Sequence, residues 1–196
     1  VTKAFFCFPG ILKEYVQFRL GMIYLSSKVR KYKKGKGKQP MIKIDDWVIE
    51  KGEKAQGKIK ITGYGIAMPA TVICGVKDGP TILITAGIHS AEYVGIQAAM
   101  ELAKEFQPEE LKGNVIIVPL VNVSGFEHRT MSLVYEDGKN LNRVFPGDPE
   151  GTAADRIAYA IVTKLFSIAD YYIDLHSGDG FEQLHPYVYY VGVVDE

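Results

Sequence analysis

Short apolar runs separated by turn residues recur along the chain and predict strands. Residues 58–62 alternate polar and apolar side chains, as expected for a strand with one buried face. Residues 81–85 are almost continuously apolar, which is typical of a strand buried on both faces. The predicted strands are residues 58–62, 70–76, 81–85, 114–121, 171–175 and 186–194.

Apolar side chains at helical spacing predict two helices between these strands. The first runs from Ser90, which can cap it, to about Gln107. The second opens with Thr152 and Asp155, a capping-box pair. The apolar faces comprise Ile96, Met100, Ala103 and Phe106 in the first helix and Ile157, Ile161, Leu165 and Ile168 in the second. Strands that alternate with helices predict an α/β fold, in which a mixed, largely parallel, twisted sheet carries helices on both faces.

Charge divides the chain into two parts. The 196 residues are 47 % hydrophobic and have a formal net charge of zero, but residues 1–40 hold ten Lys or Arg and one acid, Glu14. We therefore expect a basic N-terminal extension over residues 1–40 and a folded domain over residues 41–196. The codons for Lys33 to Lys38 would resemble a bacterial ribosome-binding site shortly before Met41. This suggests that the extension is not native and that the native protein begins at Met41.

Other interpretations of the basic segment are a solvated tail or a surface for nucleic acid or membrane. We expect neither of those two partners. The two cysteines, Cys7 and Cys74, lie far apart, so they predict no disulfide framework and favour a cytoplasmic protein. No apolar run approaches the roughly 18 residues that span a bilayer, and no secretory signal is recognisable.

Candidate metal ligands follow two of the buried strands. His89 and Glu92 lie three positions apart after residues 81–85, and His176 ends residues 171–175. In open α/β sheets, functional groups collect at the carboxyl ends of strands. Two imidazoles and one carboxylate suit zinc, at about 2.0–2.2 Å, and three protein ligands leave a position for water, as in catalytic sites. A structural role for each residue stays open, because an isolated H-x-x-E pair is common in helices.

The loop-rich segment between the helices holds candidate substrate-binding residues. Asn142 and Arg143 lie in a glycine-flanked loop, and Arg129 precedes them. The guanidinium of arginine can grip a carboxylate through two hydrogen bonds, and it can also stabilise an oxyanion. Alternatively, both arginines pair with loop acids such as Glu127 or Asp137.

Three motifs, G-I-H-S-A-E-Y-V-G, D-G-K-N-L-N-R-V-F-P-G and I-D-L-H-S-G, occur in this order from about residue 58 onward. Together they resemble the succinylglutamate desuccinylase/aspartoacylase family of zinc carboxypeptidase-like hydrolases. Where that family commonly has H-G-N-E, this chain has H-S-A-E, so the two ligand positions are kept and the residues between them differ.

The resemblance implies a zinc carboxypeptidase-like fold and one Zn²⁺ per chain, bound by His89, Glu92 and His176. It implies that Asn142 and Arg143 bind a small-molecule carboxylate substrate, and that Arg129 binds substrate or stabilises the carbonyl oxyanion. The implied reaction is hydrolysis of an amide, or of an ester, that deacylates an N-acyl amino acid or a similar substrate. A zinc carboxypeptidase acting on peptides and a non-catalytic metal-binding fragment are the alternatives.

The resemblance also implies a glutamate general base well beyond the third zinc ligand. Only twenty residues follow His176, and neither Asp179 nor Glu182 has a matching context. We therefore expect residues 41–196 to be an N-terminal part of a zinc hydrolase catalytic domain, with an incomplete sheet and the general base outside this chain. The chain is accordingly expected to bind zinc but to hydrolyse substrates very poorly.

Overall fold

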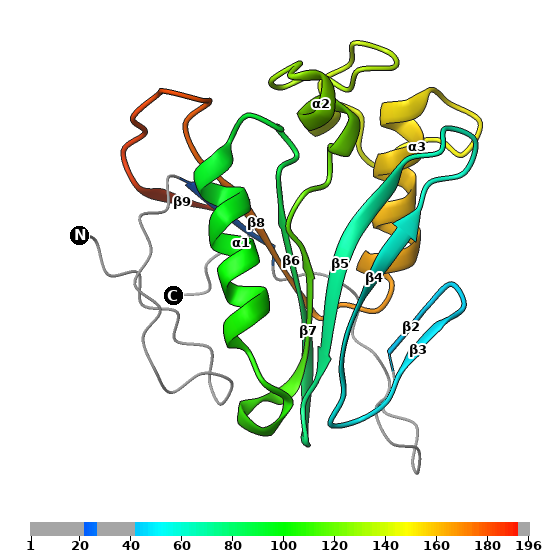
Figure 1. Ribbon diagram of the computed structural model, residues 1–196, viewed down its shortest axis with the longest axis vertical. Coiled ribbons are helices and arrows are strands. Elements are labelled where there is room, and N and C mark those ends of the chain that lie inside the picture. The colour runs from blue at the N-terminus through cyan, green and yellow to red at the C-terminus, as the bar shows by residue number, and fades with distance from the viewer. Residues whose placement is uncertain (1–21, 27–41, 192–196) are drawn as a thin grey trace.

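Most of the apolar runs form strands of one twisted, seven-stranded sheet in the computed structural model of the protein, which describes residues 22–26 and 42–191 (Figure 1). The order across the sheet is β4-β5-β7-β6-β8-β1-β9. These strands are β1 (Met22–Ser26), β4 (Lys54–Lys60), β5 (Ala67–Cys74), β6 (Lys77–Ala86), β7 (Lys112–Val118), β8 (Tyr171–His176) and β9 (Tyr187–Val191). A separate hairpin consists of β2 (Ile42–Ile44) and β3 (Trp47–Ile49).

The central ladders of the sheet are parallel. β6 pairs in parallel with both β7 and β8, whereas β5 is antiparallel to β4 and to β7. On the other side, β1 is antiparallel to β8 and parallel to β9. The carboxyl ends of β6, β7 and β8 therefore lie at one edge of the sheet, where the candidate residues were expected.

Helices cover both faces of this sheet (Figure 1). Its helices are α1 (Tyr93–Glu105), α2 (Val123–His128) and α3 (Ala153–Ala160), which continues as the π-helical turn η3 (Ile161–Phe166). Two short 3₁₀ turns, η1 (Pro108–Glu110) and η2 (Leu141–Arg143), complete the described elements. The predicted α/β class, with a mixed sheet and helices on both faces, is confirmed.

The core consists of two clusters, one on each face of the sheet. Alternation along each strand divides the side chains, so that Leu83 belongs to one cluster and Ile82 and Ile84 to the other. The helix α3 with η3 packs on the first cluster through Ile157, Ile161 and Leu165. The helix α1 packs on the second cluster through Ala98, Ala99, Leu102 and Ala103. Small side chains on α1 permit a close approach to the sheet.

Two details of the predicted helices differ from the structure. The first helix begins at Tyr93 with Glu92 as its N-cap, because the side chain of Ser90 donates instead to the carbonyl oxygen of Met131. Met100, predicted to lie on the apolar face, is 42 % exposed. The capping box of Thr152 and Asp155 is present and opens α3 as predicted.

The predicted division at residue 40 stays a prediction. The strand β1 lies within the segment expected to be an extension, and it pairs with β8 and β9. The basic stretch from Lys28 to Lys38 lies outside the described residues. Within residues 22–26 and 42–191, no helix is long and apolar enough to cross a membrane.

Candidate metal centre

A tight turn after β6 positions the first candidate ligand. The strand ends at Ala86, and Gly87 has φ +66°, a conformation that favours glycine. A Cβ on Gly87 would lie 2.8 Å from a methyl carbon of Leu120. Glycine therefore lets the chain leave the sheet closely packed against the segment after β7, with His89 at the sheet edge.

The second ligand is fixed by the docking of α1. Glu92 is the N-cap of this helix, and its backbone N–H donates to the carbonyl oxygen of His89 at 3.2 Å. A Cβ on Gly95, one turn into the helix, would lie 3.0 Å from the carbonyl oxygen of Leu175 on β8. The absence of a side chain at Gly95 thus brings the start of α1 next to the end of β8, where His176 lies.

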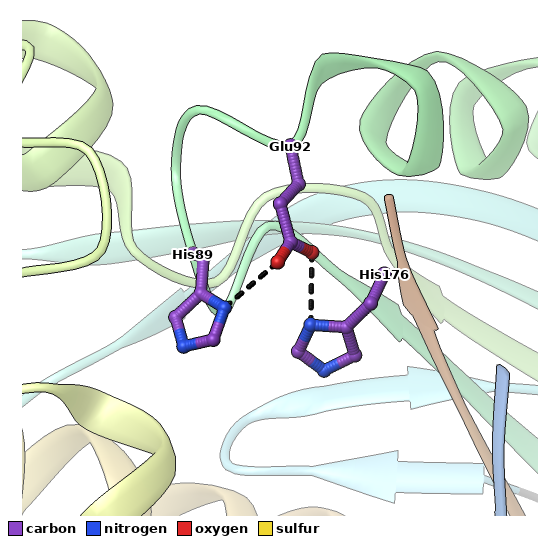
Figure 2. A group of neighbouring side chains, drawn as sticks. All are labelled: His89, Glu92 and His176. Carbon is purple, nitrogen blue, oxygen red and sulfur yellow. Dashed lines mark hydrogen bonds and ion pairs between the residues drawn. The ribbon is translucent and has the colours of Figure 1, made fainter. Parts of the chain in front are cut away.

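The three predicted ligands meet at this point (Figure 2). The Nδ1 atom of His89 lies 2.8 Å from Oε1 of Glu92, and the Nδ1 atom of His176 lies 2.8 Å from Oε2. The potential ligand atoms of all three residues lie within 4.8 Å of one another. Glu92 and His176 are buried, and His89 is partly exposed. The backbone N–H of Ser177 donates to Oε2 of Glu92 at 3.1 Å, which further fixes this carboxylate.

The outer nitrogen of each imidazole has its own partner. The Nε2 atom of His89 lies 3.2 Å from the amide oxygen of Asn140. The Nε2 atom of His176 lies 2.9 Å from Oδ2 of Asp174. With Nε2–H donating outward, each Nδ1 presents its lone pair toward Glu92 once it is deprotonated. The donor set, two imidazole nitrogens and one carboxylate, therefore fits a divalent metal such as zinc.

The electrostatics of the group suit a cation. Burial tends to raise the pKa of Glu92, but hydrogen bonds from His176 and His89 hold this pKa below its usual value. Burial tends to lower the pKa of His176, but hydrogen bonds to Asp174 and Glu92 raise it to about 10. Two carboxylates around one imidazole thus create a site that favours positive charge.

The side chains of His89, Glu92 and His176 are called the metal group below. Asn140 joins this group to the loop that holds Asn142 and Arg143. The Oδ1 atom of Asn140, which faces Nε2 of His89, also accepts from the backbone N–H of Asn142 at 2.9 Å and caps η2. Asn142 is partly exposed and Arg143 is exposed. The structure therefore places these two residues in the loop that Asn140 joins to His89, and their predicted role in substrate binding stays a prediction.

Arg129 is the exposed C-cap of α2, with a left-handed backbone (φ +57°). Among residues 42–191, no hydrogen bond or ion pair joins its side chain to the metal group or to Glu127. Asp137, the other loop acid considered as an arginine partner, accepts from the hydroxyl of Thr152 and the N–H of Ala154. The guanidinium groups of Arg129 and Arg143 thus have no acidic partner in this part of the chain.

Asp179 and Glu182, the two acids considered after His176, lie outside the three-residue group. The side chain of Glu182 is exposed and accepts from the N–H of Asp179 at 3.3 Å. Burial, followed by the charge of Glu92, raises the pKa of Asp179.

The outer partners Asp174 and Asn140 were not predicted from the sequence. Asp174 precedes His176 by two positions, so it lies on the same face of β8, and an acid within a buried strand requires a partner. That pattern could have identified it. Asn140 gives no comparable signal, because its contact with His89 depends on how a long loop folds back.

A mixed α/β sheet with a His-Glu-His group at the carboxyl ends of its strands defines a class of α/β proteins whose sheet edge carries a group that could hold a metal ion. The sequence profile of the succinylglutamate desuccinylase/aspartoacylase catalytic domain matches residues 78–190, more than half of the chain. The chain belongs to this family.

Relatives of known structure and function agree with this assignment. An N-alpha-acetyl-L-2,4-diaminobutyric acid deacetylase from Halomonas elongata is 39 % identical over 119 residues, covering 60 % of this chain and 34 % of the relative. A succinylglutamate desuccinylase/aspartoacylase from Rhodobacter sphaeroides superposes with a TM-score of 0.60 at 33 % identity, over 67 % of this chain and 42 % of that one. The ectoine utilization protein EutE from Ruegeria pomeroyi has a TM-score of 0.60 at 33 % identity, over 72 % and 44 %. The chain thus spans about a third of the length of the curated relative.

Proposed function

We propose that the protein is a zinc-dependent hydrolase of amide bonds that removes the acyl group from an N-acyl amino acid or a similar carboxylate-bearing small molecule. Membership of a deacylase family supports hydrolysis, and the deacetylase relative supports an N-acylated amino acid as substrate. The observation that carries the zinc dependence is the convergence of His89, Glu92 and His176 within 4.8 Å. Ester bonds fall within the same chemistry.

In this proposal, His89, Glu92 and His176 hold the metal through two Nδ1 atoms and the carboxylate. Zinc held there would supply Lewis acidity and would lower the pKa of bound water toward about 7. Asn140 keeps the imidazole of His89 oriented.

The substrate carboxylate binds at the loop that Asn140 ties to the metal group. The guanidinium of Arg143 donates only to the carbonyl oxygen of Asn142 among residues 42–191, so it can bind an anion in a bidentate manner. Asn142 lies beside it and can donate from its side-chain amide. Arg129 shares the negative charge that develops on the scissile carbonyl oxygen. Neither Asp179 nor Glu182 serves as the general base in this proposal, because each lies outside the three-residue group.

We propose that this activity is cytoplasmic. Cys74 is a buried free thiol, and burial raises its pKa to about 11, so it is unreactive. A structure that relies on packing, with an inert thiol, suits a reducing compartment.

The experiment that tests the proposal measures ligand binding to the zinc-loaded chain. N-acetyl-L-2,4-diaminobutyrate and other N-acetyl amino acids are compared with the matching N-acetyl amines, which lack the carboxylate, and with short peptides. We expect one zinc per chain and binding of the N-acetyl amino acids only. Arg143→Gln should weaken this binding about tenfold or more, because hydrogen bonds to charged groups contribute roughly 1.5–3 kcal/mol.

Lys58→Gln is the matched control, because it removes an exposed cation from β4, at the far edge of the sheet. Hydrolysis by the chain itself should be very slow and insensitive to Glu182→Gln. Failure to bind zinc, or equal binding with and without the carboxylate, would refute the proposed function. Preferential binding of peptides would favour a carboxypeptidase. Rapid turnover would show that the chain holds its own base.

A further inference from the structure

A column of polar side chains crosses the core beneath the metal group. Tyr172, Asp174 and His176 alternate along β8 and therefore share one face of the strand, whereas Ile173 and Leu175 belong to the cluster on the opposite face. Thr85 on β6 is the direct register partner of Asp174. Four polar residues from two strands thus come together in an otherwise apolar region.

These side chains form one chain of hydrogen bonds. Oγ1 of Thr85 donates to Oδ1 of Asp174 at 2.6 Å, and Oδ2 of Asp174 lies 2.9 Å from Nε2 of His176. The hydroxyl groups of Thr85 and Tyr172 lie 2.8 Å apart. An ionised carboxylate only accepts, so Thr85 must use its single proton on Asp174, and the Tyr172 hydroxyl must donate to Thr85. Burial keeps Tyr172 protonated, because it raises the pKa of this phenol well above its usual value.

The burial of Asp174 has a free-energy cost. This residue is 5 % exposed, and His176 is the basic side chain that forms an ion pair with it among residues 42–191. Burying a carboxylate costs several kcal/mol, and the loss of one partner of a buried ion pair leaves the other charge uncompensated. The contribution of this carboxylate therefore lies in what it does to His176.

The imidazole of His89 has a different outer partner from that of His176. The outer nitrogen of His89 faces a neutral amide oxygen at 3.2 Å, from a loop residue. The outer nitrogen of His176 faces a carboxylate at 2.9 Å, held on the same strand and fixed by a second strand. The two ligands are thus oriented by supports of unequal charge and rigidity.

We propose that Asp174 is a positioning residue, fixed by Thr85 and Tyr172, that holds His176 in the Nε2–H tautomer with Nδ1 directed at Glu92 and the metal. This inference rests on the proposed metal site. It adds Thr85 on β6 and Tyr172 on β8 as residues that hold Asp174 in place. Partners of this outer kind typically change metal affinity by about 10- to 100-fold when removed.

The test compares zinc affinity, by competition with a chelator, across variants of the full 196-residue chain. Asp174→Leu removes the acceptor and should weaken zinc binding by about 10- to 100-fold. Asp174→Asn keeps an oxygen acceptor and should retain part of that affinity. Thr85→Val and Tyr172→Phe leave the acceptor in place but free it to move, so they should give smaller losses in the same direction.

A second measurement reports the tautomer directly. In the zinc-loaded chain, ¹⁵N–¹H NMR of the imidazoles should show a slowly exchanging Nε2–H on His176. This signal should be lost in Asp174→Leu and kept in Asp174→Asn. A purely structural role would not move it in a variant that stays folded.

The controls are Asp170→Asn and Thr71→Val. Asp170 lies just before β8 at its other end and accepts from the N–H of Thr81, and Thr71 is a buried threonine on β5. Unchanged zinc affinity and an unchanged Nε2–H signal in a folded Asp174 variant would overturn the proposal, as would equal losses in the controls. If Asp174→Leu does not fold, Asp174→Asn and Thr85→Val carry the test. A wild-type chain that binds no zinc refutes the proposed function itself, which separates the two failures.

Discussion

His176 is the residue on which most interactions of the metal group converge. Its imidazole is fully buried between two carboxylates, with Glu92 at 2.8 Å from Nδ1 and Asp174 at 2.9 Å from Nε2. These hydrogen bonds raise its pKa to about 10 against the opposing effect of burial. In the metal-free protein at neutral pH, both ring nitrogens therefore carry protons.

Zinc binding should consequently release a proton from His176. A histidine ligand must be neutral at the coordinating nitrogen, so at pH 7 the metal displaces the Nδ1 proton. We expect release of about one proton per zinc from this residue, and an apparent zinc affinity that rises with pH up to about 10. Calorimetry in two buffers of different ionisation enthalpy measures the number of protons.

The surface variant His128→Ala should behave as the wild type, because His128 lies on α2 and is exposed. Proton release that is absent at pH 7, or an affinity that does not change with pH, would contradict the protonated state of His176.

The same shifts predict how the stability of the metal-free protein depends on pH. The folded pKa of His176 is above its usual value of 6.5, so its contribution is complete below pH 6.5 and is lost as pH rises toward about 10. The folded pKa of Glu92 is below its usual value of 4.5, so its contribution is present above pH 4.5 and is lost in acid. Denaturant unfolding in EDTA across this pH range should show that the free energy of unfolding falls both in acid and in alkali. His176→Ala should reduce the fall in alkali.

At the scale of elements, the docking of α1 against β8 sets the distance between Glu92 and His176. Gly95→Val should disturb it, because even a Cβ would lie 3.0 Å from the carbonyl oxygen of Leu175. Overpacking of this kind costs about 1–3 kcal/mol. We expect a lower free energy of unfolding, measured by denaturation. We also expect a loss of zinc affinity, measured by chelator competition, that is proportionally larger than the loss of stability.

Gln97→Ala serves as the control on the same helix, since Gln97 is exposed and its side chain donates to Glu101. Wild-type zinc affinity in Gly95→Val would show that α1 can shift without moving Glu92.

The start of α3 offers a second prediction that is independent of the metal. The backbone N–H of Thr152 donates to Asp155 at 3.0 Å, and its hydroxyl lies 2.6 Å from Asp137. Thr152→Ala should lower the free energy of unfolding by about 1 kcal/mol, as for other lost N-caps. Thr152→Ser should recover most of this loss. Equal stability of the alanine and serine variants would exclude the hydroxyl as the stabilising group.

Patterns within one element were predictable from the sequence, and contacts between distant elements were not. His89, Glu92 and His176 were identifiable because each follows an apolar run that ends at the sheet edge. The bond between Thr85 and Asp174 joins positions 89 residues apart and depends on the register of β6 with β8. Glu92, and not the predicted Ser90, is the N-cap of α1 because the hydroxyl of Ser90 donates to the carbonyl oxygen of Met131 in another loop.

At the scale of the molecule, the sheet depends on a strand from the first forty residues. β8 and β9 follow each other in the chain, yet β1 lies between them and pairs with both. A protein that begins at Met41 would expose the edge of β8. We expect it to be less stable or to associate through that edge, as measured by denaturation and by light scattering after size exclusion.

Tyr24→Pro in the full chain is the matched variant, because it removes one backbone donor from β1 without shortening the protein. A monomeric protein of unchanged stability that begins at Met41 would instead support the hypothesis that residues 1–40 are an extension.

The pairing of β1 also links this strand to the proposed metal site. Met22 stands opposite His176 in the ladder between β1 and β8, so this pairing restrains the backbone that carries a ligand. If the pairing of β1 with β8 increases zinc affinity, then bound zinc must stabilise the pairing of β1 by the same free energy. Zinc should therefore slow hydrogen exchange along β1, although no ligand atom belongs to it.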